Sequence, residues 1–246
     1  MFPPHLDYLK DKEIAWFNPC NGLYGFWKEL EKLKDRGVDF RLAWSGRDMK
    51  RAKEIYAASM AALALKETET PGQQWWIAKP KQDPPDAVIG TVTEVPGKGN
   101  LMSVREIEVV EHLSGSLLDT LEKKLAGKRY EPNTILVCLF SDGGFIDFKK
   151  ISAEVLQKNL SLPNIFVVAH GGLKMAPNMS EEEIREGILQ LGIIQLAPVF
   201  RHIQISPIKV CADWLAGKEG NFLQFQGRGL KPGLTKITNP NPPRLF

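Results

Sequence analysis

The fold is decided by the stretch PDAVIGTVTEVPGKGNLMSVREIEVVEH, which spans residues 85–112. Residues 87–95 and 101–110 form a block that is rich in the residue types of β-strands. The cluster between these two segments, 96–100, is rich in the Gly, Pro and Asn that form tight turns. This stretch therefore predicts a β-hairpin.

Helices and further strands are expected to alternate on both sides of the hairpin. Apolar residues recur at helical spacing, or follow helix-start signals, over 23–36, 48–66, 116–125, 152–160, 180–191 and 208–215. Short apolar runs predict strands over 40–44, 74–78, 134–140, 165–169, 193–199 and 202–205. This alternation predicts the α/β class, with a mixed central sheet flanked by helices.

One domain is expected over 1–219, because no linker-like segment interrupts it. Residues 220–246 differ in composition, with eight Gly or Pro, four Lys or Arg and no acid. This composition predicts an irregular basic tail that could follow a chain of phosphates.

Composition narrows the class of protein. Of 246 residues, 43% are hydrophobic and 25% are charged, which excludes a wholly disordered chain, a collagen and a disulfide scaffold. The net charge of +3 permits a polyanionic partner without requiring one. The three Cys form no C-x-x-C pair and are interpreted as reduced thiols. With no signal peptide and no membrane span in the sequence, we expect a cytoplasmic protein with no membrane partner.

Three carboxylates on the hairpin are the strongest chemical signal. Glu106 and Glu108 lie two residues apart, so their side chains project from one face of the strand. If the loop centres near Lys98, Asp86 shares that face on the neighbouring strand, about 4.8 Å away. Carboxylates this close repel one another, and a hard cation such as Mg²⁺ removes that penalty. The simpler alternative is that these acids face solvent on a half-exposed hairpin.

Pro85-Asp86, the hairpin and a Glu-x-Glu element together resemble the signature of the PD-(D/E)xK nucleases, the restriction-endonuclease-like superfamily. The predicted order of helix, hairpin, helix and strand over roughly 48–140 resembles the superfamily core. The resemblance implies that Asp86, Glu106 and Glu108 bind Mg²⁺, for which Mn²⁺ would substitute. It also implies cleavage of a nucleic-acid backbone by these residues.

The sequence departs from the motif at its lysine. In one register Glu108 takes the lysine position, and in the other, Glu108-Val-Val110, that position is empty. A lysine from the next helix, Lys123 or Lys124, is a candidate replacement, although both also suit a solvated helix face.

Two further residues have alternative interpretations. Glu54 matches an acid that many members carry on the preceding helix, or else is a surface residue. His112 is either a proton carrier or phosphate contact, or a packed side chain.

The sequence leaves three functions open, of which the third and weakest is a metal-dependent hydrolase of a small phosphate compound. The first is a Mg²⁺-dependent nuclease, most simply a DNA endonuclease, with nucleic acid as its partner. The second is a nuclease-like module that has lost cleavage and serves in binding or assembly, which the missing lysine favours. Whether the protein forms a homodimer is left open.

Overall fold

The protein is described from a computed structural model of its 246 residues. The structure describes residues 15–38, 49–70, 73–80, 85–96, 99–141, 146–160, 162, 164–169, 191–205, 210–220, 222–226 and 233–237. No helix within these ranges is both long enough and apolar enough to cross a membrane. The predicted strand over 40–44 and the predicted helix over 180–191 lie outside the described residues.

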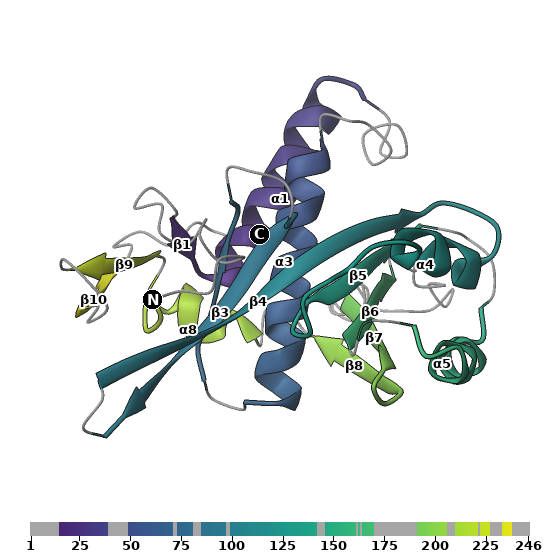
Figure 1. Cartoon of the computed structure of the whole chain (residues 1–246). Coiled ribbons are helices and arrows are strands. Elements are labelled where there is room, and N and C mark those ends of the chain that lie inside the picture. The colour runs from purple at the N-terminus through teal and green to yellow at the C-terminus, as the bar shows by residue number, and fades with distance from the viewer. Residues whose placement is uncertain are drawn as a thin grey trace. The chain divides into compact units, whose positions relative to one another are not determined.

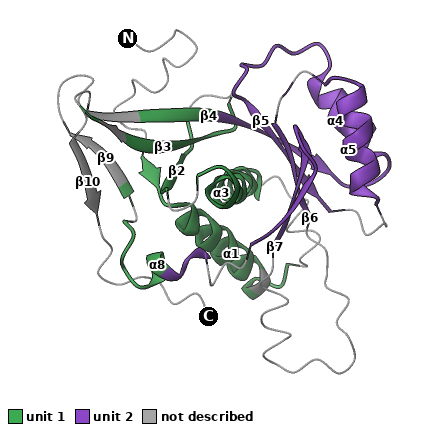
Figure 2. Cartoon of the chain, turned by 90° about the horizontal axis from the view of Figure 1, so that it is seen from below, with its two compact units in different colours: residues 1–105, 213–246 green, residues 106–212 purple. Residues whose placement is uncertain are grey.

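The chain divides into two compact units (Figure 2). The first holds residues 1–105 and 213–246, and the second holds residues 106–212. Strand β4 (Gly99–His112) begins in the first unit and ends in the second. The single domain expected over 1–219 stays a prediction.

The first unit is built on antiparallel strands and two long helices. Its strands follow the order β10-β9-β1-β2-β3-β4. They are β1 (Trp16–Phe17), β2 (Trp75–Ala78), β3 (Ala87–Val95), the start of β4, β9 (Phe222–Gln226) and β10 (Gly233–Ile237). The helices are α1 (Pro19–Asp35), α3 (Lys50–Thr68) and the short α8 (Ala212–Leu215), whose first residue belongs to the second unit. The hairpin strands over 87–95 and 101–110 are confirmed.

Helix α3 is the core of the first unit, and α1 lies beside it (Figure 1). Every residue from Tyr56 to Leu65 is buried, as expected for a helix that is apolar on all sides. The ring of Phe26 on α1 stacks on that of Tyr56, with the centroids 4.4 Å apart. Gly22 marks a close approach, because a Cβ atom there would lie 2.1 Å from the Ser59 hydroxyl.

The second unit has a mixed sheet in the order β4-β5-β6-β7-β8. Its later strands are β5 (Ile135–Phe140), β6 (Asn164–Ala169), β7 (Leu191–Ala197) and β8 (Arg201–Ile205). The β4–β5 and β5–β6 pairs are parallel, and the β6–β7 and β7–β8 pairs are antiparallel. The prediction of an α/β fold with a mixed sheet flanked by helices is therefore confirmed.

Helices α4 (Leu117–Leu125) and α5 (Phe148–Gln157) pack on this sheet through one apolar cluster. The four leucines of α4 point inward, as their spacing predicts. Ser116 caps α4 by accepting a hydrogen bond from the backbone N–H of Asp119. Asp147 caps α5 in the same way through the N–H of Lys150, so α5 begins earlier than the predicted 152.

The tail and the cysteines differ from expectation. Residues 220–246 contain strands β9 and β10, because β9 pairs with β1 and so extends the sheet of the first unit. Cys20 and Cys211 are disulfide-bonded, so the prediction of three reduced thiols is wrong for these two. A disulfide depends on which cysteines meet in the folded chain, and spacing along the sequence does not report this. The cytoplasmic location stays a prediction.

Candidate active site

The strand alternation of β4 places polar side chains beneath helix α4. Glu106, Glu108 and His112 have the same parity and therefore share one face of the strand. Glu108 and His112 both contact residues of α4, namely Lys124 and Thr120. Because Thr120 and Lys124 are four residues apart, they lie on one stripe of the helix. Polar side chains of α4 thus contact two of these three residues of β4.

Glu108 and Lys124 form a largely buried ion pair. The Lys124 Nζ lies 2.8 Å from the Glu108 Oε2, and the two side chains are 17% and 9% exposed. Removing one partner from such a pair leaves an unbalanced charge in a poorly solvated place. Within the described residues, no ion pair uses the second carboxylate oxygen of Glu108, Oε1. The alternative of a solvated face is therefore wrong for Lys124, whereas Lys123 is exposed.

His112 is packed. Its side chain is buried, its Nδ1 lies 2.9 Å from the Thr120 hydroxyl, and its ring stacks on Phe140 with centroids 5.1 Å apart. This placement favours the packed interpretation over a phosphate contact.

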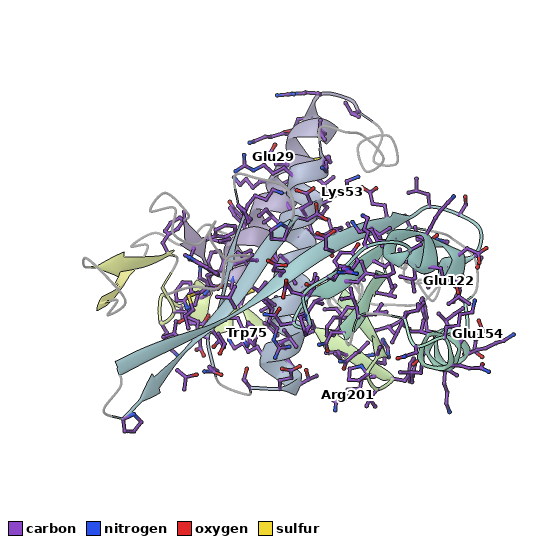
Figure 3. All side chains as sticks on the ribbon, in the orientation of Figure 1. Glu29, Lys53, Trp75, Glu122, Glu154 and Arg201 are labelled. Carbon is purple, nitrogen blue, oxygen red and sulfur yellow. The ribbon has the colours of Figure 1, made fainter. Side chains whose placement is uncertain are left out.

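A shallow cavity of about 560 Å³ follows the outer side of α4. It is lined by Ser114, Ser116, Asp119, Thr120, Glu122, Lys123 and Ala126. Glu106 and Glu108 are not among the lining residues, so this cavity is not the predicted carboxylate site. Glu122, labelled in Figure 3, marks its position on α4.

The first unit holds a second buried carboxylate. Glu54 on α3 is only 5% exposed at its side chain, and its Oε2 lies 2.9 Å from the Nζ of Lys79. Its Oε1 lies 3.4 Å from the Nζ of Lys50 and makes no hydrogen bond. The interpretation of Glu54 as a surface residue is therefore wrong. Both of its oxygens face lysines, which makes it a poor ligand for a cation.

Asp86 and Lys79 lie at the same end of the β2–β3 strand pair. Ala78 pairs with Val88, Lys79 directly follows β2, and Asp86 directly precedes β3. Asp86 is half-buried. Lys79 is the residue that the sequence analysis missed, and its only signal is a lysine directly after the buried run Trp75–Ala78.

The three predicted metal ligands are divided between the units. Asp86 belongs to the first unit, and Glu106 and Glu108 belong to the second. Their convergence therefore stays a prediction. Among the described residues, no group of three or more His, Cys, Asp or Glu side chains is placed to hold a metal ion. Glu106 and Glu108 supply hard oxygen donors of the kind that Mg²⁺ takes, and a third donor would have to come from Asp86.

The chain was compared with protein families, curated proteins and solved structures. No family model, no curated protein and no solved structure matches the chain.

Proposed function

We propose that this protein is a Mg²⁺-dependent nuclease that hydrolyses phosphodiester bonds, with DNA as its substrate. The observation that carries the proposal is the ion pair between Glu108 and Lys124. The segment that resembles the PD-(D/E)xK motif has no lysine at the position where the motif has one. Lys124, from the helix that follows the motif strand, supplies an ammonium group beside the motif carboxylate.

The order of the elements supports the same proposal. Helix α3 comes first, then strands β2, β3 and β4, then helix α4, then strand β5 parallel to β4. Asp86 stands at the start of β3, and the Glu-x-Glu element lies within β4. This is the order expected for residues 48–140 from the resemblance.

The proposed chemistry assigns a role to each side chain. Asp86, Glu106 and Glu108 would hold Mg²⁺, which polarises a phosphate and lowers the pKa of a bound water. Lys124 would offset the negative charge that develops on the phosphate during attack. Its contact with Oε2 would orient the Glu108 carboxylate, so that Oε1 would face the metal ion.

A second candidate is a nuclease-like binding module without cleavage. It is favoured by the lack of a three-ligand metal group among the described residues. The two candidates differ in metal binding and turnover, so one set of assays separates them.

The test is a cleavage assay with supercoiled plasmid, single-stranded DNA and RNA, in Mg²⁺, in Mn²⁺ and in chelator. We expect DNA cleavage that requires the metal and is lost in Asp86→Asn and in Glu108→Gln. Glu122→Gln is the matched control, because Glu122 also pairs with a lysine, Lys158, but on the more exposed outer side of α4. Cleavage that survives chelator or both active-site variants would contradict the proposal. DNA binding without cleavage in any metal would favour the binding module.

A further inference from the structure

We propose that the turn after α4, with Lys128 and Arg129 and the neighbouring Lys123, binds the phosphodiester backbone of the nucleic acid. This inference rests on the proposed function, because it takes the carboxylates of β4 as the place where the strand is cut. It adds the surface that holds the strand there.

The turn lies beside the part of β4 that contains Glu108. Helix α4 runs back along the sheet until Lys124 meets Glu108. The chain then turns through Gly127 and enters β5 at Ile135, which pairs with Ile107. Lys124 contacts Glu108, and Leu136 pairs with Glu108 in the sheet. Residues 126–134 join these two segments, so the turn lies near Glu108.

The turn is held in one conformation by its own hydrogen bonds. The N–H of Lys128 donates to the Leu125 carbonyl at 3.3 Å, and the N–H of Thr134 donates to the Glu131 carbonyl at 2.9 Å. The Tyr130 hydroxyl donates to the Lys124 carbonyl at 3.0 Å, while its ring packs on the core of the unit. Gly127 supplies the positive φ of 69° that the turn needs. A surface ordered in advance loses less entropy when a ligand binds.

The turn over 126–134 has a net positive charge, because it contains Lys128 and Arg129 and one acid, Glu131. Lys123, Lys128 and Arg129 are exposed, and within the described residues none of them takes part in an ion pair. One exposed lysine of the same unit, Lys158, has acidic side chains around it. Lys158 pairs with Glu122 and has Asp119 and Glu154 nearby, and these acids help to raise its pKa. Two of these acids, Glu122 on α4 and Glu154 on α5, are labelled in Figure 3.

Several exposed cations beside a carboxylate site can bind a polyanion whose charges repeat along its length. A nucleic-acid backbone carries one charge per phosphate, and each phosphate neutralised by Lys or Arg releases counterions. The two side chains that belong to the turn itself are Lys128 and Arg129. Their removal should weaken binding and reduce its dependence on salt.

The test is fluorescence anisotropy with a labelled 20-base-pair DNA duplex in chelator, so that binding is measured without cleavage. We expect Lys128→Ser with Arg129→Ser to raise Kd at least tenfold at low salt. The slope of log K against log salt should fall by about 1.8, which is about 0.9 for each phosphate that the variant no longer neutralises. The control is Lys149→Ser with Lys150→Ser, which removes the same charge from the exposed first turn of α5, beyond the opposite end of β5. This control should change Kd less than twofold.

Three results would overturn the inference: no DNA binding by the wild type, equal losses of affinity in the two double variants, or binding only to anionic lipid vesicles. Circular dichroism of each variant confirms that a loss of binding is not a loss of folding. A parallel cleavage assay in Mg²⁺ keeps the two proposals apart. If the wild type cleaves but Lys128→Ser with Arg129→Ser binds normally, this inference fails and the proposed function stands. If binding depends on the turn but nothing is cleaved, the nuclease proposal fails instead.

Discussion

Among the described residues, each unit contains one buried glutamate that is paired with a lysine, and the two pairs differ in their surroundings. The N–O distances are nearly the same, 2.9 Å for Lys79–Glu54 and 2.8 Å for Lys124–Glu108. Glu54 has a lysine at each carboxylate oxygen and is 5% exposed. Among the described residues, Glu108 has a lysine at Oε2 and no ion pair at Oε1, and Glu106, two residues earlier, lies on the same face of the strand.

This difference indicates which of the two carboxylates can still bind a cation. A carboxylate whose two oxygens both face ammonium groups has little remaining attraction for a cation. A carboxylate with one oxygen held and the other open is oriented and can still accept a ligand. We therefore interpret Glu54–Lys79 as a structural pair and Glu108–Lys124 as the functional pair.

The largest expected effect is on cleavage. Replacing Lys124 by Met removes the charge proposed to stabilise the attacked phosphate, so the single-turnover rate should fall by about 100-fold or more. Lys79→Met should lower the same rate by less than about tenfold, since Glu54 is not assigned to the metal. Rates measured at saturating Mg²⁺ and DNA make the comparison. Equal losses of rate in the two variants would remove the distinction between the pairs.

Stability should rank the same two variants in the opposite order. Lys79→Met leaves the buried Glu54 with only the longer contact to the exposed Lys50, at 3.4 Å, which should cost about 3 kcal/mol of unfolding free energy. Lys124→Met should cost less, about 1–2 kcal/mol, because Glu108 and Lys124 are more exposed and water compensates in part. Urea unfolding followed by circular dichroism measures both. A larger loss for Lys124→Met would show that burial does not separate the pairs as described.

The dependence of stability on alkaline pH tests whether water reaches the sheet beside Glu108. Cys138 of β5 pairs with Val110 of β4, and burial raises the pKa of its thiol to about 12. The folded state therefore keeps this proton after the unfolded chain, with a thiol pKa near 9, has lost it. This contribution to stability is complete below pH 9 and should fall by up to about 1.4 kcal/mol per pH unit between pH 9 and 12.

Cys138→Val should flatten the loss of stability between pH 9 and 12, measured as urea midpoints at a series of pH values. Burial also raises the pKa of Tyr56 in the first unit, so Tyr56→Phe is the comparison variant. An unchanged pH profile for Cys138→Val would mean that water reaches β5.

The smallest effect is expected at the exposed pair of Lys158 and Glu122, which joins α5 to α4. Both side chains are more than a third exposed, Lys158 at 46% and Glu122 at 35%. Solvent screens such pairs, so Lys158→Met should leave the urea midpoint and the cleavage rate unchanged within error. A clear loss in either quantity would show that exposure is a poor guide to the roles of the other two pairs.

Local patterns in the sequence predict most of the described fold. The β-rich segments 87–95 and 101–110, with a turn-forming cluster between them, predict the hairpin. The leucines over 117–125 predict α4 and its inward face. The predicted start of α5 is wrong because Asp147, its cap, precedes the apolar residues on which the prediction is based.

The candidate site is predicted only in part, because its key contacts join distant segments. Glu106 and Glu108 can be placed on one face from their spacing alone, and Lys124 is one of two candidates for the missing lysine. The contact of Lys79 with Glu54 depends on how α3 packs against the end of β2, which no local pattern reports. The same holds for the packing of His112 on Phe140 and for the disulfide bonding of Cys20 and Cys211.

The most direct measurement is anomalous diffraction from crystals grown in Mn²⁺. We expect one strong peak within coordination distance of carboxylate oxygens from both Asp86 and Glu108, with Lys124 still bound to Glu108. That peak should disappear in Asp86→Asn. A peak bound by other residues, or none at these carboxylates in the presence of Mn²⁺, would contradict the claim that the three acids share a metal ion.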